Sequence, residues 1–170
     1  NQPLIQMLID ILKKIFSSWK NQKTHITVTL TEVAPSASLQ KETQMFVNPN
    51  EILMGREVAN PLTPEMKKNL DRLLIAVNRL RALWGKPLIV SSGYRPADIN
   101  KAVGGAQKSH HLTCAAVDFR DPDQALAKWL VSRLDVLEAC SLWMEDPSKT
   151  KGWVHVQIFP PKSGRRIFLP

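Results

Sequence analysis

Cysteine, histidine and long apolar runs are scarce in this sequence, and each scarcity excludes a class of protein. The 170 residues include two cysteines and four histidines. Cys114 and Cys140 form no CxxC pair, which excludes a zinc knuckle and a disulfide framework. We expect two buried free thiols, since unpaired cysteine behaves as a small hydrophobic residue, and a single disulfide between them is the alternative. No apolar run is long enough to span a bilayer.

Positive charge is abundant, but it is not gathered into a basic block. The net charge of +8 favours an anionic partner, such as nucleic acid, acidic lipid or an anionic cell-wall polymer. Because the basic residues are scattered and no nucleic-acid motif is present, we expect no nucleic-acid partner. The length is that of one domain with a short extension.

The N-terminal segment has a different pattern from the rest of the chain. Residues 3–20 carry apolar side chains at helical spacing, which predicts an amphipathic helix. Such a helix lies on an anionic membrane surface or, as we expect by default, docks on its own domain or a partner chain. Residues 24–33 alternate like a half-buried strand and residues 34–50 resemble a linker. We therefore predict an N-terminal region, 1–44, and a main domain, 45–170.

The main domain mixes helix and strand signals. Thr63 as N-cap and Gly85 as the terminating residue bound the clearest predicted helix. Another helix is expected over 122–140, capped by Asp121 and with Leu134 facing inward. This mixture implies an α+β fold with a largely antiparallel sheet and flanking helices. The predicted strands are residues 88–92, 115–119, 141–145, 153–159 and 165–169.

Strand alternation places polar side chains on one open face of the predicted sheet. In the run AAVDF, Asp118 lies on the face opposite the apolar residues, and His155 does the same in WVHVQIF. If these two strands pair, Asp118 and His155 share a face. One of His110 and His111 then joins them from the preceding loop.

Two histidines and one aspartate, with a fourth position left to water, form a catalytic zinc set. The metal lowers the pKa of bound water to about 7, and a nearby carboxylate takes the proton as the water attacks a carbonyl. Two alternatives stand beside this hypothesis. A histidine on a strand is more often an ordinary hydrogen-bonded residue, and a Ser/His/Asp triad with Ser109 as nucleophile lacks the usual strand-turn-helix signature.

The stretches SSGYRPADINKAVGGAQKSHHLTCAAVDF and GWVHVQ resemble the zinc D-Ala-D-Ala carboxypeptidase and L-alanyl-D-glutamate endopeptidase family of bacterial and phage cell-wall peptidases. The family pattern is Ser-x-His-x-x-Gly-x-Ala-x-Asp, followed by a Trp-x-His strand, and the resemblance covers about residues 50–160. It implies a hedgehog-like α+β fold and Zn²⁺ held by His111, Asp118 and His155. The matching residues are Ser109, His111, Ala116, Asp118, Trp153 and His155.

The resemblance also assigns further roles and exposes departures. It places Arg95 where a guanidinium holds a substrate carboxylate or polarises the scissile carbonyl, with a surface ion pair in the turn as the alternative. Cys114 replaces a family glycine, and either crowds the site or adds a thiolate ligand. Gly152 replaces the family's carboxylate and cannot transfer a proton. We therefore expect Glu145 as general base, with Asp146 second, and a solvated strand-end charge as the alternative.

The function that the resemblance implies is zinc-dependent hydrolysis of peptide bonds in peptidoglycan stem peptides, by a carboxypeptidase or an endopeptidase of the endolysin kind. The alternative, favoured by Gly152 and Cys114, is a non-catalytic module that binds cell-wall peptide or a partner protein. We expect a monomer in the bacterial cell envelope, in the periplasm or cell wall, from a cellular or phage gene. Residues 3–20 are the candidate contact with an anionic membrane surface.

Overall fold

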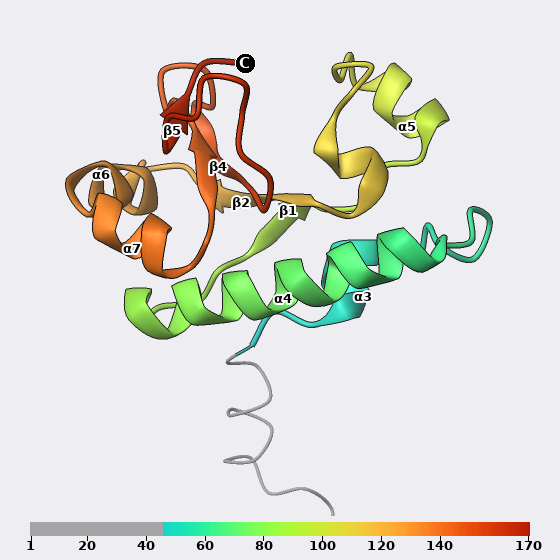
Figure 1. The fold of residues 1–170 in the computed structure, drawn as a ribbon, viewed down its shortest axis with the longest axis horizontal. Coiled ribbons are helices and arrows are strands. Elements are labelled where there is room, and N and C mark those ends of the chain that lie inside the picture. The colour runs from blue at the N-terminus through green and yellow to red at the C-terminus, as the bar shows by residue number, and fades with distance from the viewer. Residues whose placement is uncertain (1–45) are drawn as a thin grey trace, which may run out of the picture. The chain divides into compact units, whose positions relative to one another are not determined.

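The computed structural model describes residues 46–170 (Figure 1). The helix predicted over 3–20, the strand over 24–33 and the boundary between 44 and 45 lie outside the described residues. The helices are α3 (Pro49–Leu53), α4 (Pro64–Trp84), α5 (Ala97–Ala102), the 3₁₀ helix η1 (His110–Thr113), α6 (Ala125–Ser132) and α7 (Leu134–Ala139). The strands are β1 (Val90–Ser92), β2 (Ala116–Asp121), β3 (Trp143–Glu145), β4 (Gly152–Gln157) and β5 (Ile167–Phe168).

The five strands form one sheet in the order β1-β2-β4-β3-β5. Every neighbouring pair is antiparallel except β3 and β5, which run parallel. The predicted α+β class with a largely antiparallel sheet is therefore confirmed, and the last strand lies at an edge, as expected. The central pair, β2 and β4, aligns Asp118 directly with His155, which is the pairing that the site requires.

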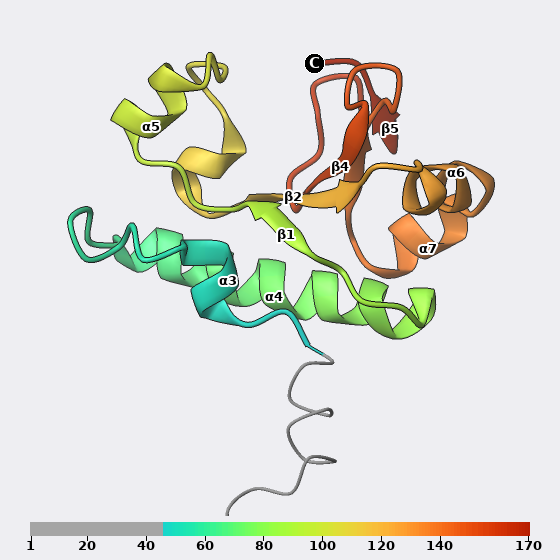
Figure 2. The same cartoon turned by 180° about the vertical axis from the view of Figure 1, so that it is seen from behind.

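Helix α4 runs beneath β1 and β2 in both Figure 1 and Figure 2. Its first turn is capped by Thr63, whose hydroxyl accepts a hydrogen bond from the amide of Met66. It ends at Gly85, which has a φ of 70°, a left-handed conformation that glycine adopts without a Cβ clash. Leu73 and Val77 from this helix are fully buried in the same core as Phe119 of β2, so the helix supports the strand that carries Asp118.

The single long helix expected after Asp121 is wrong, because the chain breaks at Arg133 into α6 and α7. Arg133 has an extended φ of −135°, which interrupts the helical hydrogen bonds and turns Leu134 out to 44% exposure, against the predicted inward orientation. Asp121 does cap the helix with its side chain, although the N-cap position itself is occupied by Gln124. Its buried carboxylate accepts hydrogen bonds from the amides of Leu126 and Ala127.

Cys114 and Cys140 are both free and buried, as predicted. Each contributes to the apolar core beneath the sheet rather than to a crosslink. Among residues 46–170, no helix combines the length and the hydropathy needed to cross a membrane.

Candidate metal centre

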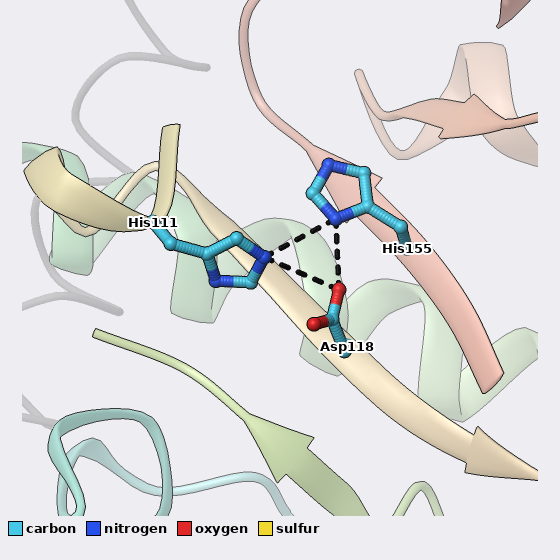
Figure 3. Close-up of side chains that lie close together, drawn as sticks. All are labelled: His111, Asp118 and His155. Atoms are coloured by element: carbon cyan, nitrogen blue, oxygen red, sulfur yellow. Dashed lines mark hydrogen bonds and ion pairs between the residues drawn. The ribbon is translucent and has the colours of Figure 1, made fainter. Parts of the chain in front are cut away.

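Three elements bring His111, Asp118 and His155 together (Figure 3). Asp118 and His155 face each other from β2 and β4, while His111 comes from η1. Two contacts fix the position of η1: the Ser109 hydroxyl accepts from the amide of His111, and the His111 carbonyl accepts from the amide of Arg95. All three side chains are buried, and they point at one another, as the alternation of the two strands predicts.

The spacing of the donor atoms fits a zinc ion. His111 Nε2 lies 3.2 Å from both Asp118 Oδ1 and His155 Nδ1, and the last two atoms are 2.8 Å apart. Ligands about 2.0–2.1 Å from a tetrahedral zinc are separated from one another by roughly 3.3 Å. The triangle of donor atoms therefore has close to the size that zinc requires, and its composition, two imidazoles and one carboxylate, suits that metal.

The protonation of His111 directs a lone pair toward the cluster. His111 Nδ1 lies 2.7 Å from the carbonyl of Gly93, so Nδ1 carries the proton and donates it to that oxygen. Burial lowers the pKa of His111, which keeps the ring neutral and leaves Nε2 as an unprotonated donor. Gly93 must be glycine, because a Cβ there would lie 2.0 Å from the backbone oxygen of Ile52.

His155 is oriented by Gln157, a residue to which the sequence pattern gave no role. Gln157 is buried, and its amide nitrogen donates to the carbonyl of Phe159 at 2.7 Å. The amide oxygen therefore faces His155 Nε2 at 3.3 Å and accepts its proton, which leaves Nδ1 free to bind a metal. Gln157 lies two residues after His155 in β4, so strand alternation puts both on the same face, and that was the available signal.

Asp118 divides its two oxygens between the cluster and Arg95. Oδ1 belongs to the donor triangle, while Oδ2 forms an ion pair with the Arg95 guanidinium at 2.9 Å. Burial favours the neutral acid, but hydrogen bonds and charge interactions with the imidazoles of His111 and His155 outweigh it and hold the pKa of Asp118 well below its usual value. A bound metal ion would take over this role from the imidazole protons. Arg95 is thus in a largely buried pair with a donor residue, rather than in a surface pair within the turn.

The two candidate bases lie in different places. Glu145 lines the same pocket of about 470 Å³ as the three donor residues, and burial raises its pKa. Asp146 is absent from that lining. Its carboxylate accepts a 2.9 Å hydrogen bond from the amide of Ser148, and this contact lowers its pKa. Only Glu145 therefore combines access to the metal centre with an elevated proton affinity.

Gly152 and Cys114, the two departures from the family pattern, both lie away from the donor atoms. Gly152 begins β4 opposite Asp121 with a φ of 90°, a conformation that disfavours any side chain there. Cys114 is fully buried in the core, and burial raises the pKa of its thiol to about 12. The expectation that Cys114 crowds the metal or adds a thiolate ligand is wrong, because Cys114 lies outside the donor cluster and does not line the metal pocket.

The other two residues considered from the sequence, Ser109 and His110, line the metal pocket but lie outside the donor set. The Ser109 hydroxyl accepts from the backbone of η1 and has no imidazole partner among residues 46–170, which removes the basis for a serine nucleophile in this part of the chain. His110 stacks against Phe159, with ring centroids 5.5 Å apart. The choice of His111 over its neighbour as the inward residue agrees with the structure.

A largely antiparallel sheet here presents a His-Asp-His donor set suited to a metal ion, in a pocket that a half-buried carboxylate also lines, and this arrangement is the one expected of a metallopeptidase. The comparison with known families agrees: the family model described as Peptidase M15 matches residues 38–157, more than half of the chain. The chain belongs to the peptidase M15 family, whose members are metallopeptidases that typically depend on zinc. Among curated proteins, none matches the sequence. The matched segment contains the donor residues and Glu145, so the resemblance noted from the sequence is confirmed.

Proposed function

We propose that this protein hydrolyses peptide bonds in peptidoglycan stem peptides with zinc held by His111, Asp118 and His155. The observation that carries the proposal is the convergence of three donor atoms, from His111, Asp118 and His155, in a pocket that Glu145 also lines. A donor set of this kind leaves a ligand position free, which distinguishes catalytic zinc sites from closed structural ones.

Zinc, when bound, supplies a Lewis acid that activates water and polarises the scissile carbonyl. Glu145 is the group that removes a proton from the attacking water and later gives it to the leaving amine. Burial raises its pKa toward the working pH, which suits a group that must both accept and donate. Arg95 holds Asp118 in place through Oδ2, and it also lines the pocket, where its guanidinium is available to a substrate oxygen.

The proposed substrate and location follow from the resemblance to cell-wall peptidases and from the net charge of the chain. A net charge of +8 favours retention near anionic wall polymers. We therefore place the protein in the bacterial cell envelope, acting as a monomer on stem peptides, whether its gene is cellular or carried by a phage. Contact of residues 3–20 with an anionic membrane stays a prediction, since those residues lie outside the described part of the chain.

Mass spectrometry of purified muropeptides, incubated with the protein and zinc, tests the proposal directly. The expected result is the loss of D-alanine or the release of shortened peptides, together with one zinc per chain. The matched variants are Glu145→Gln, which should keep zinc and lose hydrolysis, and His111→Ala, which should lose both. Stoichiometric zinc with no hydrolysis of any stem peptide would instead support the binding module as the function.

A further inference from the structure

A second pocket, of about 610 Å³, adjoins the metal pocket. The two share Lys108, Ser109 and His110 in their linings, so this short segment is the wall between them. The next two residues line different pockets: His111 lines the metal pocket and Leu112 lines the second pocket. A peptide bound at the metal centre can therefore continue across this wall.

The second pocket has an apolar floor with fixed walls. Met66, Leu112 and Phe159 line it. The Phe159 ring is in contact with both His110, at 5.5 Å between centroids, and the guanidinium of Arg72, at 5.2 Å from the ring centroid. These contacts hold the ring in place without substrate, so the pocket is largely formed in advance.

The charges that line the second pocket cancel. Glu65 and Lys108 carry opposite charges, and the other lining residues carry no formal charge apart from the titratable His110. A charged occupant would lose hydration over the apolar floor, a cost that Lys108 or Glu65 at the wall offsets only in part, whereas an aliphatic occupant gains from burial against the apolar side chains.

We infer that this pocket is a subsite for an uncharged, aliphatic residue of the peptide substrate, a few positions from the bond that is cut. The inference rests on the proposed function, because the metal centre defines where that bond lies. Because the two pockets share lining residues, a peptide that leaves the metal pocket over this segment enters the second pocket within a few positions, each of which spans about 3.3–3.6 Å when extended.

The test measures kcat/KM for synthetic peptides that carry alanine, leucine or glutamate at one position at a time on each side of the cut bond. At one position, leucine should be preferred over alanine by about tenfold, the effect of added methylenes in an apolar site, and glutamate should be disfavoured. Gln107 is exposed and lines only the second of the two pockets, so Gln107→Trp fills it and should bring the leucine-to-alanine ratio close to one. Ala139→Trp, a substitution at another exposed residue outside both linings, should keep the wild-type ratio.

Met66→Ala provides a second variant in case the tryptophan disturbs folding, which thermal unfolding would reveal. It enlarges the pocket and should shift the preference from leucine toward phenylalanine. A leucine-to-alanine ratio of one at every position in the wild type, or an unchanged ratio in both pocket variants, would overturn the subsite.

Binding measurements separate this inference from the proposed function. If the wild type cleaves none of the peptides, the hydrolytic proposal fails, and calorimetry with the same peptides then decides on the subsite. Tighter binding of the leucine peptide that Gln107→Trp abolishes would support it, and equal affinities for the leucine and alanine peptides would overturn it.

Discussion

Glu145 and Asp146 are neighbours in the chain, but their carboxylates lie in different environments. Glu145 ends β3 beside Phe168 of β5 and faces the metal pocket, where burial raises its pKa. Asp146 begins the following turn, where the amide of Ser148 satisfies its carboxylate and lowers its pKa. One peptide bond thus separates a group suited to proton transfer from a group suited to stabilising a turn. The difference arises because Glu145 is the last residue of β3, whereas Asp146 already belongs to the turn that follows it.

The largest effect should come from removing a metal-donor atom. This change tests metal binding itself, before the roles of Glu145 and Asp146 are compared. His111→Ala leaves only two of the three donors, so zinc per chain should fall from one to near zero and hydrolysis should be lost. Atomic absorption on the dialysed protein measures this. His110→Ala is the matched control, since it changes the adjacent histidine outside the donor set, and it should keep zinc. Equal zinc in both variants would contradict the assignment.

The next largest effect concerns the two carboxylates themselves. Glu145→Gln should lower kcat/KM by about 10²–10⁴-fold with zinc retained, because it removes the proton acceptor without changing the size of the side chain. Asp146→Asn should leave the rate at the wild-type level, because this carboxylate is outside the pocket. Steady-state hydrolysis of a muropeptide measures both. A larger loss in the Asp146 variant would reverse their roles.

A smaller effect should follow from losing the orientation of His155. Gln157→Leu removes the acceptor of the His155 Nε2 proton, and zinc affinity should fall by about 10–100-fold, as for other residues that orient metal ligands. Competition with a chelator of known affinity measures the change. Gln107→Leu makes the same substitution at an exposed residue outside the metal pocket and should leave zinc affinity unchanged.

The smallest but most diagnostic effect is in the pH profile. Glu145 must be ionised to accept a proton, so kcat/KM should fall as the pH drops through its pKa. Because burial raises that pKa above the ordinary 4.5, the acid limb should lie at a higher pH than for an exposed glutamate. Asp146→Asn should keep the limb in place, whereas any residual activity of Glu145→Gln should lack it. A limb at or below 4.5 would contradict the environment described for Glu145.

Much of the fold could be predicted because local rules were obeyed without conflict. Thr63 and Gly85 end α4 where capping chemistry requires, and alternation in β2 and β4 placed Asp118 and His155 on one face. The helix after Asp121 could not be predicted, since its apolar pattern continues through the break at Arg133. The location of Cys114 was missed for a related reason: proximity to His111 along the chain did not determine which way its side chain turns.

The sequence by itself determined the residue types of the centre, the helix ends and the face of each strand, because these depend on neighbours a few positions apart. Only the tertiary structure decided which nitrogen of each histidine faces the cluster. Those choices depend on Gly93, 18 residues from His111, and on Gln157, whose amide is oriented by the Phe159 carbonyl. Hydrogen bonds of this kind form only after the strands have paired, and so no local pattern specifies them.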